Sequence, residues 1–193
     1  MAGGGKITLN QKVASTRVRP GCPLPLPGVA GIVSLREITA SDREFLFQLY
    51  AASRAEELAQ TGWTELQKGQ FLRMQFQAQD TYYRQNYAGA EFLAVTVDGA
   101  GAGRLYLQRG EREWRIMDIT LAPVFQRRGI GGGLLRLIQE EAGESGVCLT
   151  IHVEVFNPAR RLYERLGFAP VETNNQVYIR MEWRTSEGAP AGN

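Results

Sequence analysis

The sequence predicts a single α/β (α+β) domain with a mixed sheet, in the element order β-αα-βββ-α-β-α-ββ. Three observations lead to this prediction. Apolar and polar residues alternate over residues 147–153, as in a strand with one buried face. Apolar residues recur at helical spacing over residues 130–142. Turn signals at Asp98-Gly99 and Gly110 separate three β-type runs, which predicts an antiparallel meander.

The composition is that of an ordinary soluble globular protein. The chain has 193 residues, of which 44% are hydrophobic and 22% charged, enough for one domain with a sizeable core. No apolar run approaches the roughly 20 residues that span a bilayer, which excludes an integral membrane protein. The first residues lack the apolar core of a secretory signal. We therefore expect a cytoplasmic protein that does not act at a membrane.

Cysteine, histidine and charge exclude several functions. Cys22 and Cys148 are far apart in sequence, so we expect neither a disulfide framework nor a metal site. His152 is the single histidine, which disfavours zinc chemistry and Ser-His-Asp hydrolysis. The first 34 residues carry four basic residues and no acid, whereas the remainder is slightly acidic. The body of the protein therefore has no charge excess that would suit a nucleic acid.

The chain divides into three parts by composition. Residues 1–32 are rich in glycine and proline and are basic, which favours a flexible amino-terminal arm over a packed element. Residues 33–185 hold the regular elements, and residues 186–193 are predicted to be a flexible tail.

The first half of the domain is predicted to contain a strand and two helices. The strand covers residues 35–38, and Thr39 or Ser41 caps a helix that Gly62 ends. Thr64 and Gln67 form a capping-box pattern. A long helix is therefore predicted from this point to about residues 87–89.

The second half begins with the meander. Its three strands cover residues 91–97, 103–108 and 113–122. After the helix over residues 130–142, Gly146 leads into the alternating strand. The remaining elements are predicted to be a short helix and two strands, over residues 159–166, 168–171 and 177–183.

The segment between the third meander strand and the following helix carries the clearest chemical signal. A strand runs into a basic, glycine-rich loop with Arg127, Arg128, Gly129 and Gly131, and the loop runs straight into a helix. Unpaired backbone N–H groups and the positive end of the helix dipole would meet there, as in anion-binding sites. The glycines would let an anion approach the backbone closely.

Two common phosphate-binding motifs do not fit this loop. A P-loop needs Lys and Ser or Thr after its last glycine, where this chain has Leu134-Leu135. A dinucleotide fingerprint counted from Gly129 needs a glycine at position 134 and an early βαβ unit. The alternative that remains open is a tight strand-to-helix connection that binds nothing.

Two motifs in this chain resemble a known family. Gln126-x-x-Gly129-x-Gly131 resembles the acetyl-CoA pyrophosphate motif of the GNAT acetyltransferase superfamily. Residues 157–168, which read NPARRLYERLGF, resemble its second motif, in the right order and separated by one helix and one strand. The resemblance covers about residues 33–184. It implies an N-acetyltransferase, with acetyl-CoA as co-substrate between two splayed central strands, here residues 113–122 and 147–153.

The resemblance also implies roles for residues. The backbone of residues 119–121 would pair with the pantetheine arm, and an N–H near Leu121 would stabilise the oxyanion. The amides of residues 126–131 would hold the pyrophosphate, and Asn157 would bond to the cofactor arm. The implied cofactor-binding residues are Ile119, Thr120, Leu121, Gln126, Arg127, Arg128, Gly129, Ile130, Gly131, Gly132 and Asn157.

Tyr163 is implied to be the general acid that protonates the departing CoA sulfur. A phenol is protonated at neutral pH and comparable in acidity to the thiol that forms. The alternative is a tyrosine that simply packs against Phe168. The general base that deprotonates the amine stays open between Asp118 and Glu154, with His152 as a third candidate. Regular alternation would place Asp118 on one strand face with Ile116 and Thr120, as a carboxylate between apolar neighbours, and Glu154 ends the following strand.

The predicted reaction is direct attack of a primary amine on acetyl-CoA through a tetrahedral intermediate, without a metal. The acceptor is a small-molecule or peptide amine, and Glu56, Glu57 and Trp63 would suit a cationic amine or form a solvated helix face. The alternatives are a non-catalytic acyl-CoA-binding module that docks onto a partner, and a transferase for longer acyl groups. A homodimer is compatible with either.

Overall fold

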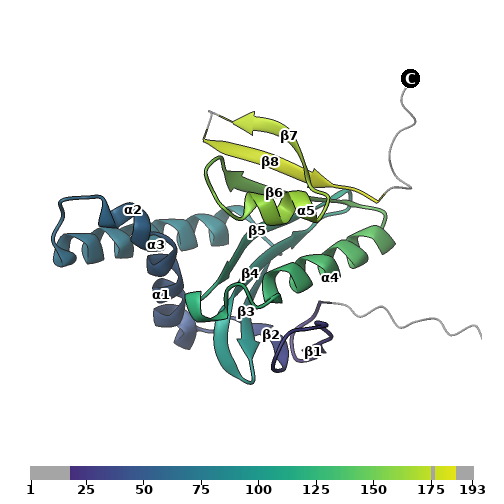
Figure 1. Ribbon diagram of the computed structural model, residues 1–193, viewed down its shortest axis with the longest axis horizontal. Coiled ribbons are helices and arrows are strands. Elements are labelled where there is room, and N and C mark those ends of the chain that lie inside the picture. The colour runs from purple at the N-terminus through teal and green to yellow at the C-terminus, as the bar shows by residue number, and fades with distance from the viewer. Residues whose placement is uncertain (1–17, 175–176, 186–193) are drawn as a thin grey trace, which may run out of the picture.

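One mixed sheet of eight strands runs through the middle of the protein (Figure 1). The computed structural model describes residues 18–174 and 177–185. The strands are β1 (Pro23–Leu24), β2 (Val33–Glu37), β3 (Glu91–Val97), β4 (Ala100–Arg109), β5 (Glu113–Leu121), β6 (Cys148–Glu154), β7 (Ala169–Asn174) and β8 (Tyr178–Trp183). Their order in the sheet is β1-β2-β3-β4-β5-β6-β8-β7. Only β5 and β6 are parallel neighbours in the described sheet.

Helices cover both faces of this sheet. They are α1 (Arg43–Ser53), α2 (Ala55–Ala59), α3 (Glu65–Asn86), α4 (Ile130–Glu144) and α5 (Arg160–Arg165). The pair α4 and α5 lies on one face, whereas α1 and α3 lie on the other (Figure 1). The predicted fold class and element order are confirmed, with a short strand β1 and a short helix α2 in addition. No helix in the described part of the chain is long and apolar enough to cross a membrane.

The helices before β3 differ in part from the prediction. The capping box at the start of α3 is confirmed, because Thr64 Oγ1 accepts from the Gln67 N–H at 3.3 Å and Gln67 Oε1 accepts from the Thr64 N–H at 2.9 Å. The helix expected to continue to Gly62 instead breaks at Arg54. The Arg54 guanidinium reaches Glu154 at the end of β6, at 3.1 Å. This ion pair connects the junction of α1 and α2 to β6, in the centre of the sheet.

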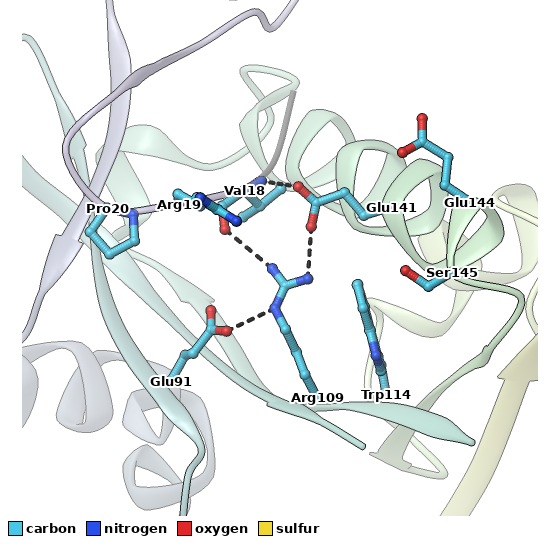
Figure 2. Close-up of a pocket in the computed structure, with 9 residues that line it drawn as sticks. All are labelled: Val18, Arg19, Pro20, Glu91, Arg109, Trp114, Glu141, Glu144 and Ser145. Carbon is cyan, nitrogen blue, oxygen red and sulfur yellow. Dashed lines mark hydrogen bonds and ion pairs between the residues drawn. The ribbon is translucent and has the colours of Figure 1, made fainter. Parts of the chain in front are cut away.

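Residues 18–32 are packed, which corrects the prediction of a flexible arm through residue 32. Val18, Leu24 and Leu26 are buried in the core, and β1 pairs with β2. The Val18 N–H donates to Glu141 of α4, whose other oxygen accepts from Arg109 at 2.7 Å (Figure 2). These apolar residues lie among prolines and glycines, whose abundance is typical of a flexible arm. Residues 1–17 and 186–193 lie outside the described residues.

A one-residue bulge interrupts β5 at Met117. Tyr106 of β4 pairs with Asp118, but the next residue, Leu107, pairs with Ile116. Because side chains alternate between the faces of a strand, the extra residue reverses the alternation beyond it. Ile116 therefore faces α4, and Asp118 faces the opposite side of the sheet.

Strands β5 and β6 part just beside this bulge. Their last pair is Ile116 with Ile151, whereas β5 continues to Leu121 and β6 to Glu154. The predicted splay of the two central strands is thus present in the structure. It leaves the edge of β5 after Ile116 without a strand partner on the β6 side in the described sheet.

Candidate active site

A groove of about 1030 Å³ opens where β5 and β6 part. The end of β5, the loop before α4, the first turns of α4 and the start of α5 form its walls. This volume is large enough for a ligand of cofactor size. The predicted site residues that line it are Ile119, Leu121, Gln126, Arg127, Gly129, Gly131, Gly132, Asn157 and Tyr163.

The free edge of β5 presents backbone groups to this groove. The Ala122 N–H donates to the Ala102 carbonyl of β4 at 2.9 Å. Successive residues of a strand direct their backbone groups to opposite neighbours, so those of Leu121 and Ile119 point toward the splay. The Gln126 side-chain amide already donates to the Leu121 carbonyl at 2.8 Å. The Leu121 N–H is therefore placed to donate to a ligand.

The loop before α4 supplies further backbone donors. Arg127 and Gly129 both have positive φ angles, of 58° and 83°. This conformation favours glycine, and it turns the chain sharply into the helix. The first N–H that bonds back within α4 is that of Gly133, to the Gly129 carbonyl at 2.9 Å. The N–H groups of residues 130–132 thus have no acceptor among the described residues, and at the positive end of the helix they suit a pyrophosphate.

Two glycines of α4 keep the groove open above these donors. A β-carbon on Gly131 would lie 3.7 Å from Leu121 Cδ1, and one on Gly132 would lie 3.7 Å from Leu162 Cδ1. Neither contact is a clash, so side chains at these positions would project beside the free amides without disturbing the core.

Tyr163 of α5 is buried at the inner end of the groove, with 5% of its surface exposed. Its ring meets Phe168 edge-on at 5.9 Å between ring centres. Its hydroxyl makes no hydrogen bond with the described residues. Burial, followed by the negative charge of Asp118, raises the pKa of Tyr163 to about 12. The phenol is therefore protonated throughout the neutral range and free to donate.

Asn157 lies at the rim of the groove. Its Oδ1 accepts from the Ala159 N–H at 2.9 Å, and its backbone carbonyl accepts from the Arg160 N–H at 3.1 Å. The oxygen of the side chain is thus used to start α5. The amide NH₂ of the same side chain is left to donate to a ligand.

Three of the predicted cofactor residues do not line the groove. Thr120 lies on the opposite face, where its hydroxyl donates to Asp118 at 2.7 Å. The Arg128 guanidinium lies over the Phe125 ring, 5.5 Å from its centre. The side chain of Ile130 is 1% exposed and belongs to the core, so this residue can offer its backbone amide alone.

Asp118 has a different environment from the one expected. The sequence placed it beside Ile116 on one strand face, but the bulge at Met117 puts Ile116 on the other face. Both Asp118 oxygens accept from the buried Arg104, at 3.1 Å and 2.7 Å. The carboxylate is thus held in a nearly fully buried ion pair rather than among apolar neighbours. Sequence reasoning missed Arg104, although a charge inside an apolar strand is itself a signal.

Glu154 lies on the same face as Asp118, at the end of β6. One of its oxygens accepts from Arg54 at 3.1 Å, and the same Arg54 nitrogen donates to Glu57 at 3.2 Å. The second Glu154 oxygen makes no hydrogen bond with the described residues. Glu154 therefore combines partial exposure with a free acceptor atom.

Several groove residues were missed by the sequence reasoning. They are Leu135, Arg136, Pro158, Ala159, Leu162, Arg165 and Leu166. On α4, Leu135 and Arg136 follow Gly131 and Gly132 by one turn, which is the spacing that could have identified them. The others lie beside Asn157 and Tyr163 in the second motif.

The site unites an unpaired strand edge, a helix start with free amides, and a protonated phenol between them. Free backbone donors beside a protonated phenol suit a ligand that carries phosphate groups on an extended arm. Residues 46–168 match the family model of the acetyltransferase (GNAT) family. The chain belongs to this family, and it is an acetyltransferase with acetyl-CoA as its co-substrate.

Solved structures of the same class resemble the protein. PaiA N-acetyltransferase from Thermoplasma acidophilum, in complex with coenzyme A, is 19% identical, with a TM-score of 0.60 over 79% of this chain and 98% of its own. The ribosomal-protein-S18-alanine N-acetyltransferase from Escherichia coli is 20% identical, with a TM-score of 0.56 over 83% and 99%. RimJ from Mycobacterium smegmatis, in complex with CoA-disulfide, is 16% identical, with a TM-score of 0.55 over 86% and 87%. At these identities the likeness concerns the fold. No curated protein matches the sequence significantly.

Proposed function

We propose that the domain, which begins no later than Val18 and extends to about residue 185, transfers acetyl from acetyl-CoA to a primary amine by direct attack. The acceptor is an amine on a small molecule or a peptide. The observation that carries this proposal is that Tyr163 lines the same groove as the free amides of the loop before α4 and the edge of β5.

The groove residues divide the co-substrate between them. The free amides of the loop and of the α4 start bind the pyrophosphate, and Arg127 adds positive charge. The pantetheine arm lies along the edge of β5 and pairs with Ile119 and Leu121 as an added strand would. The side-chain amide of Asn157 donates to this arm.

The chemistry then follows from three groups. The amine nitrogen attacks the carbonyl carbon of the thioester, and the Leu121 N–H stabilises the negative charge on the carbonyl oxygen, a contact worth about 3 kcal/mol. The C–S bond breaks as the tetrahedral intermediate collapses. Tyr163 gives its proton to the departing sulfur, and a base accepts one proton from the amine.

We assign the base to Glu154 in preference to Asp118. Both oxygens of Asp118 are occupied by Arg104, and one of them also by Thr120. Among the described residues, the Glu154 side chain has one polar contact, with Arg54, and its second oxygen can take the proton directly or through a water. Asp118 serves as a fixed negative charge opposite Tyr163.

The test combines binding and turnover. Calorimetry with CoA measures occupation of the groove, and release of free CoA from acetyl-CoA over a panel of polyamines, amino acids, antibiotics and peptides measures transfer. We expect CoA binding and amine-dependent release with one acceptor class. Binding without release for any amine would favour the non-catalytic module. A cytoplasmic location and a homodimer stay predictions.

A further inference from the structure

The side of the sheet that α4 and α5 do not cover is the side from which the acceptor reaches the splay. This step rests on the proposed function, because the co-substrate would fill the groove on the α4 side. Around the splay, the side chains on this side, which is the face that α1 and α3 partly cover, include those of Asp118, His152 and Glu154, which alternate with core residues of β5 and β6. A charged side chain without a partner of opposite sign on this side would therefore favour an acceptor that carries the opposite charge.

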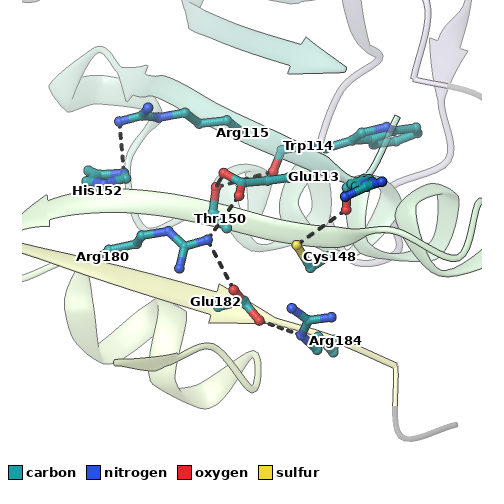
Figure 3. A network of polar contacts seen from close by, with 10 residues as sticks. Glu113, Trp114, Arg115, Cys148, Thr150, His152, Arg180, Glu182 and Arg184 are labelled. Atoms are coloured by element: carbon teal, nitrogen blue, oxygen red, sulfur yellow. Dashed lines mark hydrogen bonds and ion pairs between the residues drawn. The ribbon is translucent and has the colours of Figure 1, made fainter. Parts of the chain in front are cut away.

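Most charges on this side have a partner of opposite sign. Asp118 is paired with Arg104, and Glu154 is paired with Arg54. Arg180 of β8 is paired with both Glu113 and Glu182, at 2.9 Å and 3.2 Å (Figure 3).

Arg115 of β5 is different. It makes no ion pair with any carboxylate of the described residues. Its guanidinium lies over the Tyr87 ring, 5.6 Å from the ring centre, and Tyr87 ends α3. The ring and the helix end hold the cation in place without neutralising its full charge.

The position of the Arg115 guanidinium matters as much as its charge. Arg115 precedes Ile116, the last β5 residue paired with β6, and its side chain extends toward His152, the first β6 residue beyond the pairing (Figure 3). One Arg115 nitrogen lies 3.0 Å from His152 Nδ1. An arginine can only donate, so Nδ1 accepts and the neutral ring carries its proton on Nε2. Burial, followed by the charges of Arg115 and Arg180, lowers the pKa of His152, against the smaller opposing effect of the Glu113 and Glu172 charges.

On the acceptor side of the sheet, at the point where β5 and β6 begin to part, the protein thus offers a partly buried guanidinium with unused donors and an imidazole that is itself a donor. We infer that Arg115 and His152 form a subsite for a carboxylate, so that the acceptor is an amine that also carries a carboxylate group. A planar guanidinium fork matches a carboxylate in geometry as well as charge. Glu154 and Asp118 lie on the same side beyond the subsite, where they would face the amine end.

The single histidine of the chain makes the subsite directly observable. The NMR signal of the imidazole Cε1–H is recorded at fixed pH while glutarate, a dicarboxylate, is added to the full-length protein, with and without CoA. Glutaramide, the uncharged diamide of the same shape, is added in parallel. We expect a saturable shift of the His152 signal with glutarate and none with glutaramide. Equal responses to glutarate and glutaramide, or no response to glutarate, would overturn the inference. A response to inorganic phosphate without a response to glutarate would overturn it as well.

Variants locate the response. Arg115→Gln should weaken the apparent affinity for glutarate by about tenfold or more, because charge-assisted hydrogen bonds are lost. Arg115→Lys keeps the charge without the fork and should show an intermediate affinity. Arg112→Gln removes an equal charge from an exposed position in the turn before β5 and should bind glutarate as the wild type does. An unchanged affinity in both Arg115 variants would contradict the assignment.

Calorimetry with CoA on the same samples separates this inference from the proposed function. Normal CoA binding together with an unresponsive His152 signal rejects the carboxylate subsite alone. Failure of the wild type to bind CoA rejects the proposed function, whatever the histidine signal shows.

Discussion

Leu26 packs so closely against Gly133 that a β-carbon on this glycine would lie 2.8 Å from Leu26 Cδ2. The segment before β2 therefore presses on the first turns of α4, directly behind the candidate anion site. Gly133→Ala should lower the free energy of unfolding by about 1–3 kcal/mol, because the methyl group overpacks the contact. Urea unfolding measures this change. Gly132→Ala is the matched control, since its β-carbon meets nothing closer than 3.7 Å.

The same contact predicts a coupling between the two positions. Leu26→Ala alone should cost about 2–4 kcal/mol of the free energy of unfolding, through the cavity that it leaves. In that background Gly133→Ala should cost nothing, since the clashing atoms are gone. A full penalty for Gly133→Ala without Leu26 would show that the glycine is required for another reason.

Deletion of residues 1–30 should destabilise the fold, because it removes the buried side chains of Leu26, Val18 and Leu24 from the core.

Gly131→Val should abolish or strongly weaken CoA binding. The valine side chain would project beside the free amides of α4 and keep a phosphate from reaching them. Loss of one or two charge-assisted hydrogen bonds corresponds to about tenfold to several hundredfold in affinity by calorimetry. Gly69→Val, on α3 where an added β-carbon would meet nothing within 4 Å, should bind CoA normally. Wild-type affinity in Gly131→Val would remove the anion site from this loop.

Tyr163→Phe should lower kcat without much change in CoA affinity. The ring and its contact with Phe168 survive, so the change removes the hydroxyl alone. Loss of one general acid costs about 10²-fold to 10⁴-fold in kcat. The defect should shrink with a thioester whose leaving thiol is more acidic. A change confined to KM would point to a binding role instead.

The pH dependence of wild-type kcat gives a second test of Tyr163. The acid acts in its protonated form, so its contribution is present below its pKa and is lost as the pH rises through that value. The pKa is raised to about 12, above the ordinary phenol value. We therefore expect no alkaline fall in kcat from this residue up to about pH 10. A loss centred near pH 8 or 9 that disappears in Tyr163→Phe would contradict this expectation.

Asp118→Asn and Glu154→Gln should differ in what they damage. Asp118→Asn leaves the nearly fully buried Arg104 without its counter-charge, at a cost of about 3–5 kcal/mol in the free energy of unfolding. Glu154→Gln breaks a partly exposed ion pair with Arg54 and should change that free energy by less than about 1 kcal/mol. Its kcat should nonetheless fall on the order of 10²-fold if Glu154 is the base. Unchanged kcat in Glu154→Gln would reassign the base.

The elements that sequence reasoning located well are those with local signals. The strand over Glu91–Val97 and the start of α3 at Thr64 agree with the prediction, because alternation and capping boxes depend on neighbours in the chain. The glycine loop and Tyr163 belong to motifs of the same local kind, and the structure brings them to one groove.

The features that escaped prediction depend on residues distant in sequence. The bulge at Met117 arises from register with β4, so the alternation of β5 alone could not reveal on which side Asp118 lies. Its partner Arg104 stands on another strand. The burial of Leu26 depends on a glycine more than one hundred positions away, at Gly133, and no helical or strand periodicity around Leu26 indicates that burial.

The four residue pairs that join β5 to β6 also bear on the order in which the chain folds. From β2 to β5 each strand lies beside its predecessor, with α1, α2 and α3 in the first connection and short turns in the others, so this part can assemble as it leaves the ribosome. Strand β6 must wait until α4 has crossed the sheet, and β8 and β7 can join only after it. The splay is therefore the boundary between an early-folding and a late-folding part of one sheet.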